Sequence, residues 1–254
     1  MVRLKLLFGG ALLAAAILGG LVVLGLQALL PGIGGDKAQV ERIVHSYLLE
    51  NPAILREMME KLQQQENAEA QKAQDSAQAA VPAALPALTT PFASAWAGNP
   101  NGDVTVTVFM DYACGYCRAS LPGLAELIAK DPNVRVVYRE YPVLGEASVT
   151  AARFALAAAQ AGKFRAFHDA LFASGGPSNA TISDAIAKAG LDPAATQKLA
   201  NSDAIAKEID ANHRLGARLA MNGTPAWVVG KQILYGARDY QALADAVAIA
   251  RKTK

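Results

Sequence analysis

The sequence predicts an α/β domain with a helical insertion, preceded by an N-terminal helical arm. Three observations predict this organisation. Strand patterns at 104–110 and 134–141 flank a helical pattern, which is the order of a βαβ unit. Helical patterns then fill residues 146–220, and a second pair of strand patterns follows. Residues 36–80, in contrast, contain only helix-forming segments.

Composition and charge exclude one class of function. Arg3 and Lys5 are the only charged residues among the first 35 of the 254 residues, so the rest of the chain has 22 basic and 22 acidic side chains. A nucleic-acid-binding domain normally has a basic surface. The balanced charge and the lack of any such motif argue against nucleic acid as a partner.

The N-terminus has the pattern of an export segment. Two basic residues precede an apolar run from Leu6 to Leu26. The run is long enough to span a bilayer, and no clear cleavage site follows it. Residues 1–30 are therefore either a cleaved signal peptide or a retained anchor in the inner membrane, formed by residues 6–30. Both readings predict a periplasmic location, where cysteines can be oxidised.

Residues 36–80 read as two amphipathic helices separated at Asn51-Pro52. The first has an apolar stripe that comprises Val40, Ile43, Val44, Tyr47 and Leu48. Two short helices cannot bury such a stripe by themselves. We predict that this arm forms a homo-oligomer; the alternative is an arm folded onto its own domain.

We interpret residues 81–98 as a linker. Residues 81–91 contain three prolines and no charge, which predicts an extended, semi-stiff spacer. Turn signals follow at 99–102, and Trp96 reads as a packing residue at the domain edge. The α/β domain is expected to occupy residues 99–254.

Cys114 and Cys117 are the only cysteines in the chain, and they are two residues apart after the first strand. A helix begins directly after them, so Cys114 is expected at a helix N-terminus, where free N–H groups and the helix dipole favour a thiolate. A disulfide ring this small adds little stability, so chemistry is the better reason for the spacing. Asp111 either assists proton transfer near the thiols or is an ordinary turn residue.

The second half of the domain contains two histidines and a further candidate site at Thr224-Pro225. His168 and His213 in the helical insertion lack the spacing of metal ligands and are expected to be structural or exposed. Thr224-Pro225 precedes a β-hairpin pattern at 226–235. This proline is either a simple strand start or a cis-proline.

These motifs together resemble the DsbA family of thioredoxin-like thiol–disulfide oxidoreductases. Residues 98–118, GNPNGDVTVTVFMDYACGYCR, look like the start of the Com1/ScsC-like branch, and GTPAWVVG looks like its cis-proline loop. The resemblance implies a thioredoxin-like fold in which Cys114 is the nucleophile and Cys117 resolves the mixed disulfide. It also implies that the loop with Thr224 and Pro225 packs beside the cysteines and binds the substrate.

One departure from the strongly oxidising members is the dipeptide between the cysteines. Gly115 and Tyr116 replace the Pro-His pair, whose histidine stabilises the thiolate in those enzymes. We therefore expect a less oxidising disulfide. Gly115 and Tyr116 are also assigned to substrate binding, together with the proline loop.

The resulting prediction is thiol–disulfide exchange on exported proteins, as an isomerase or oxidoreductase without a cofactor. The direction of electron flow stays open. The implied partners are exported cysteine-containing clients, a membrane redox protein similar to DsbD or DsbB, and further copies of the chain, because some ScsC-like proteins are trimers. The alternative function is a periplasmic protein that binds or handles copper through the two thiols.

Overall fold

The structure, a computed structural model, describes residues 37–253 and divides into two compact units. The first ends at Asn67 and the second begins at Ala68. Helix α3 (Ala53–Thr89) contributes to both. The predicted export segment, 1–30, lies outside the described residues. Among the helices that the structure describes, none combines the length and the apolar character needed to cross a membrane.

The first unit contains helix α2 (Lys37–Glu50) and the start of α3. The predicted break at Asn51-Pro52 is present, since α2 ends at Glu50 and α3 begins at Ala53. No residue of α2 is buried. Its apolar stripe is instead between 43% and 59% exposed, at Val40, Ile43, Val44, Tyr47 and Leu48.

The second unit is built around a mixed five-stranded sheet with the order β1-β3-β2-β4-β5. Its strands are β1 (Trp96–Gly98), β2 (Val104–Met110), β3 (Val134–Glu140), β4 (Ala226–Val229) and β5 (Gln232–Tyr235). Strands β2 and β3 are parallel, and the other pairs are antiparallel. The predicted βαβ unit and hairpin are confirmed. Strand β1 was not predicted, because residues 81–98 were assigned to the linker.

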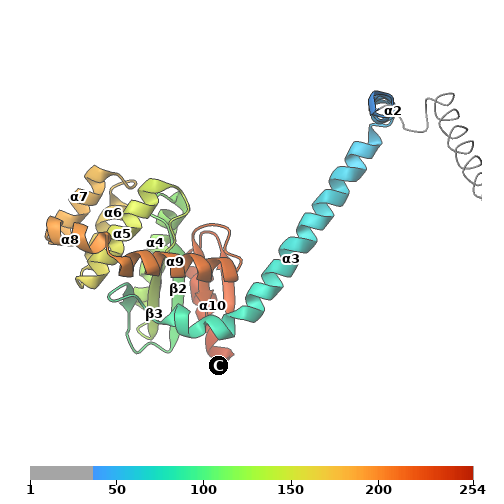
Figure 1. Cartoon of the computed structure of the whole chain (residues 1–254). Coiled ribbons are helices and arrows are strands. Elements are labelled where there is room, and N and C mark those ends of the chain that lie inside the picture. Colours follow the sequence, from blue (N-terminus) through green and yellow to red (C-terminus); the bar gives the residue numbers. More distant parts are fainter. Residues whose placement is uncertain (1–36, 254) are drawn as a thin grey trace, which may run out of the picture. The chain divides into compact units, whose positions relative to one another are not determined.

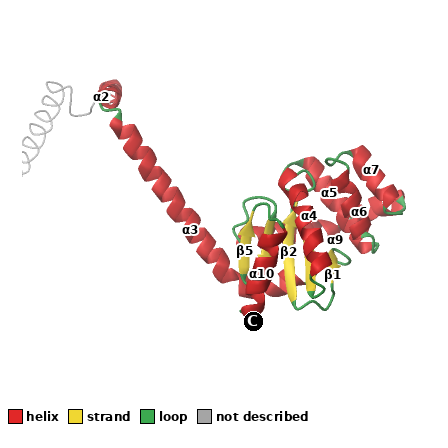
Figure 2. Cartoon of the chain, turned by 180° about the vertical axis from the view of Figure 1, so that it is seen from behind, coloured by secondary structure: helices red, strands yellow, loops and turns green. Residues whose placement is uncertain are grey.

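The central strand β2 is buried on both faces, which explains its nearly continuous apolar sequence. Val106, Val108 and Met110 face one core cluster, and Phe109 belongs to a second cluster on the other face. Helices α4 (Gly115–Lys130) and α10 (Tyr240–Lys252) pack on the first face, as Figure 2 shows. The C-terminal part of α3 covers the second face.

The predicted helical insertion lies between β3 and β4. It comprises α5 (Glu146–Gln160), α6 (Phe164–Ala173), α7 (Asn179–Lys188), α8 (Pro193–Ala200) and α9 (Asp203–Arg218). These helices pack mainly on one another, with α5 contacting α6, α8 and α9 (Figure 1). This arrangement confirms a thioredoxin-like α/β fold with a helical insertion and N-terminal helices.

The expectation of an extended spacer at 81–91 was wrong, because α3 continues to Thr89. Pro82 and Pro86 are both exposed on the outer side of the helix. The inner side, with Val81 and Leu88, is fully buried against the sheet. An internal proline costs a helix about 3 kcal/mol, and here the burial of the inner side offsets that cost. The limits of the arm, linker and α/β domain stay predictions.

Candidate active site

The two cysteines lie where β2 passes into α4. Cys114 is the N-cap of α4, with the extended backbone typical of that position (φ −81°, ψ 115°). Its sulfur accepts a hydrogen bond from the N–H of Cys117 at 3.4 Å. A sulfur at a helix N-cap receives free N–H groups and the positive end of the helix dipole, and both stabilise negative charge. The position predicted for Cys114 is confirmed.

The two thiols differ in their surroundings. Cys114 is 6% exposed and Cys117 is completely buried; both are free thiols in this structure. Burial raises the pKa of the Cys117 thiol well above its usual value, although the backbone N–H of Asp111 donates to this sulfur at 3.5 Å. At neutral pH Cys117 is therefore protonated, and Cys114 is the more accessible sulfur of the pair.

The loop before β4 completes one side of the site. The Thr224-Pro225 peptide bond is cis. The Cys114 thiol donates to the carbonyl oxygen of Thr224 at 3.2 Å, so the structure brings together two segments that are 110 residues apart. The loop is also attached to the end of β5, because the N–H of Gly236 donates to the carbonyl oxygen of Pro225 at 2.9 Å.

Gly115 and Tyr116 form the first turn of α4 on the solvent side. The Tyr116 side chain is 72% exposed, which is unusual for a large aromatic residue. A Cβ atom placed on Gly115 would meet no atom within 4 Å. All the residues predicted for the site, Cys114, Gly115, Tyr116, Cys117, Thr224 and Pro225, thus belong to two adjoining segments.

Asp111 has a structural role. One carboxylate oxygen accepts from the N–H of Ala113 at 2.8 Å, and the other accepts from Val143 at 2.8 Å and Leu144 at 3.0 Å. The side chain is 1% exposed. Of the two readings offered by the sequence, the structure favours the turn residue, because Asp111 ties the cysteine loop to the loop after β3.

A buried polar cluster that the sequence did not predict lies under this loop. The Tyr112 hydroxyl donates to Oε1 of Glu140 at 3.2 Å and lies 3.0 Å from Nδ1 of His168. All three side chains are nearly inaccessible, and Glu140 Oε2 and His168 Nε2 have no hydrogen-bond partner among residues 37–253. Burial raises the pKa of Glu140 well above its usual value and lowers the pKa of His168 to about 3. The His168 imidazole is therefore neutral near pH 7, and burial favours the neutral form of the Glu140 carboxyl.

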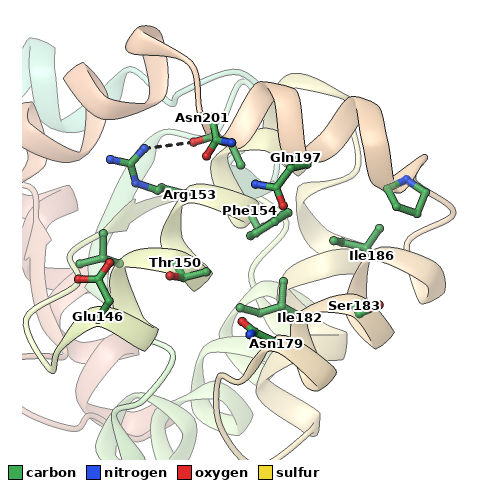
Figure 3. Close-up of a pocket in the computed structure, with 13 residues that line it drawn as sticks. Glu146, Thr150, Arg153, Phe154, Asn179, Ile182, Ser183, Ile186, Gln197 and Asn201 are labelled. Atoms are coloured by element: carbon green, nitrogen blue, oxygen red, sulfur yellow. Dashed lines mark hydrogen bonds between the residues drawn. The ribbon is translucent and has the colours of Figure 1, made fainter.

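The described residues offer no metal centre, since no group of three or more histidine, cysteine or acidic side chains converges among them. A cavity of about 630 Å³ lies between α5, α7 and α8 (Figure 3). Arg153 at its edge donates to the carbonyl oxygen of Ala200 at 3.3 Å, and Phe154 and Ile182 line it. No cysteine lines this cavity, so it is separate from the thiol site.

Comparison with known families agrees with this site. Residues 105–248, more than half of the chain, match the model of the DsbA-like thioredoxin domain, and this segment contains both cysteines and Pro225. The chain belongs to the DsbA-like thioredoxin domain family. Residues 36–69 match a second model, the N-terminal domain of the copper resistance protein ScsC. This DsbA-like chain is therefore a member of the ScsC-like branch of an oxidoreductase family.

Solved structures support the same assignment. A thioredoxin-like oxidoreductase from Silicibacter pomeroyi is 43% identical, with 65% of this chain and 96% of that chain covered and a TM-score of 0.62. A periplasmic thioredoxin-like protein from Salmonella enterica serovar Typhimurium is 30% identical (65% and 93% covered, TM-score 0.59). A linker-deletion mutant of Proteus mirabilis ScsC is 28% identical (88% and 100% covered, TM-score 0.65). The comparison with curated proteins gave no significant match.

Proposed function

We propose that this DsbA-like protein catalyses thiol–disulfide exchange on exported proteins, with Cys114 as the nucleophile and Cys117 as the resolving thiol. The observation that carries the proposal is the asymmetry of the two sulfurs. Cys114 caps the helix, keeps 6% of its surface exposed and donates to the Thr224 carbonyl, whereas Cys117 is fully buried. A client sulfur can reach the first, and only an intramolecular step can use the second.

The exchange proceeds in two steps. The Cys114 thiolate attacks one sulfur of a client disulfide, so that an S–S bond to Cys114 forms while the client bond breaks and its second sulfur leaves as a thiolate. Cys117 then loses its proton and attacks the Cys114 sulfur, which releases the reduced client and leaves the Cys114–Cys117 disulfide. Two electrons pass to the client. The reverse sequence oxidises a client dithiol, and attack by a client thiolate on the mixed disulfide isomerises it.

The four residues around the sulfurs are proposed to bind the client. The loop with Thr224 and Pro225 borders Cys114 through the Thr224 carbonyl oxygen, and the Tyr116 side chain is exposed in the first turn of α4. The open space next to Gly115 leaves room for a polypeptide over the helix N-terminus. Tyr116 has no positive charge with which to stabilise the Cys114 thiolate. We therefore propose a less oxidising disulfide than that of enzymes with a Pro-His dipeptide.

We propose a periplasmic location. One similar structure is described as a periplasmic thioredoxin-like protein, and an exchange enzyme needs clients that form disulfides. Residues 1–30 would supply the export signal, either cleaved or kept as an inner-membrane anchor at 6–30. A DsbD- or DsbB-like membrane protein would then return Cys114 and Cys117 to their working redox state.

We further propose that residues 36–80 join copies of the chain. Helix α2 buries none of its side chains, and its apolar stripe continues in Leu55, Met58 and Met59 of α3, each at least 60% exposed. A concentration of exposed apolar side chains of this kind marks an interaction site. Light scattering coupled to size exclusion should show an oligomer for a chain starting at residue 36 and a monomer for one starting at residue 68. A monomeric longer chain would refute the assembly.

The exchange itself is tested by refolding of scrambled ribonuclease and by reduction of insulin. The protein should accelerate at least one of these reactions, and which one it accelerates assigns the direction of electron flow. Cys114→Ser should abolish the activity. An active Cys114→Ser variant would refute the mechanism, and an inactive natural protein in both assays would refute the proposed function.

Copper handling is the second candidate function. The match of residues 36–69 to a domain of a copper resistance protein favours it, and two thiolates can hold Cu(I). The described residues provide no third ligand next to the sulfurs. Metal analysis of the reduced protein after exposure to Cu(I) tests this candidate, which requires stoichiometric copper that is lost in Cys117→Ser.

A further inference from the structure

A cleft of about 380 Å³ borders the loop that carries Thr224 and Pro225. One wall comes from helix α3 and consists of Ala70, Ala73 and Gln74. The opposite wall is the loop itself, and the remaining lining is Ala220, Asn222, Gly223, Tyr235 and Gly236. Every one of these residues belongs to the second compact unit. The cleft is thus a feature of the catalytic unit, although part of it comes from a helix that begins in the arm.

The helical wall is fixed in place by contacts that begin one turn further along α3. Ala77 and Val81 are buried, and Gln78 donates from its side-chain amide to the carbonyl oxygen of Lys231 in the β4–β5 turn. Near the end of the helix, the Thr107 hydroxyl donates to the carbonyl oxygen of Leu88 at 2.9 Å. The wall is therefore set by packing on the sheet.

The shape and chemistry of the cleft suit an extended polypeptide. Its helical wall has two alanines, whose short side chains leave space open, and a Cβ placed on Gly223 would meet nothing within 4 Å. In the described part of the chain, the Thr224 N–H has no hydrogen-bond partner, and the Thr224 carbonyl oxygen accepts a hydrogen bond only from the Cys114 thiol. An extended segment can satisfy such free backbone groups by strand-like pairing.

We propose that α3 forms one wall of the client-binding site, with Ala70, Ala73 and Gln74 contacting the client segment next to the cysteine that reacts with Cys114. This inference depends on the exchange function proposed above. The cleft adjoins the reacting sulfur, because Thr224 lines it and the Thr224 carbonyl oxygen lies 3.2 Å from Cys114 Sγ. The clients it favours are polypeptides whose cysteine lies in an extended, unfolded segment with small or polar neighbours.

The test is to fill the cleft from the helical side. Ala73→Trp places an indole in the cleft, and Ala79→Trp is the matched control, because Ala79 is exposed on the same helix and does not line the cleft. Both variants carry the same cost in helix propensity. Two substrates are compared for each protein: an unstructured decapeptide joined to glutathione through its single cysteine, and bis(2-hydroxyethyl) disulfide, which has no flanking polypeptide.

Ala73→Trp should lower kcat/KM for the peptide about tenfold or more, through a higher KM. The factor by which kcat/KM falls should be at least fivefold larger for the peptide than for the small disulfide. Ala79→Trp should match the natural protein on both substrates. Ala70→Trp provides a second filled cleft, and circular dichroism checks folding. An unchanged peptide KM in both filled variants, or an equal loss on both substrates, would overturn the inference. A natural protein inactive on both substrates would instead refute the exchange function.

Discussion

Glu140 and His168 should give this protein an unusual dependence of stability on pH, because their shifts have opposite signs. The pKa of Glu140 is raised from its ordinary 4.5, so the folded state binds more protons than the unfolded state above pH 4.5. Stability must then fall as pH rises, with a slope of about 1.4 kcal/mol per pH unit for one proton at 25 °C. This loss continues up to the pKa of the folded state.

His168 acts in the other direction. Its pKa is lowered from 6.5 to about 3, so between these values the unfolded state binds more protons and stability rises with pH. Above pH 4.5 the two slopes oppose each other; the gain from His168 ends at pH 6.5, and the loss from Glu140 ends at its raised pKa. The causes are chiefly burial, with Asp111 acting on Glu140 and Arg165 acting on His168.

The assay is urea unfolding of the reduced protein at half-unit steps from pH 5 to pH 8. The difference in unfolding free energy between Glu140→Gln and the natural protein should grow as pH rises, by at most about 1.4 kcal/mol per pH unit, until the pH passes the raised pKa of Glu140. His168→Phe should change the slope only below pH 6.5. Glu69→Gln removes an exposed carboxyl on α3 and is the control for the loss of a carboxyl as such. A difference for Glu140→Gln that does not change with pH would refute the burial of a neutral carboxyl.

Three further predictions follow from the site and its support. Cys117→Ser should accumulate a client adduct on Cys114, visible as added mass; an absence of adduct would contradict the resolving role. Leu88→Ala should lower the unfolding free energy in urea by about 2–5 kcal/mol, because this leucine is fully buried; a loss below 1 kcal/mol would contradict the packing of α3. Asp111→Ala should cost about 1–3 kcal/mol and speed hydrogen exchange at Val143 and Leu144, and protected amides would refute its bracing role.

The sequence predicted the parts of the site that depend on local chemistry. An apolar run followed by Cys-x-x-Cys and a helical pattern placed Cys114 at the start of a helix, and the structure has it at the N-cap. The proline loop could be assigned only through the family resemblance, since nothing near Thr224 in the sequence indicates contact with a residue 110 positions earlier. Periodicity predicts elements, and it does not predict which loops meet.

The buried cluster could not be predicted because its members come from three separate elements. Tyr112 lies in the cysteine loop, Glu140 ends β3 and His168 is in α6. None of the three interrupts the sequence pattern of its own element. A single histidine on an apolar helix face is usually an ordinary core residue. Strand β1 was missed for a simpler reason, because three residues are too few to show an alternating pattern.

Helix α3 changes how the arm must be tested. A chain that starts at residue 99, the predicted domain limit, would lose the self-association surface, one wall of the cleft and the cover over Phe109 and Val228 at once. Loss of isomerase activity in that chain could not be assigned to any one of these. A chain that starts at residue 68 keeps Ala70, Ala73 and the buried face of α3 and lacks α2. Full exchange on the decapeptide together with lost isomerisation in that chain would separate assembly from client binding.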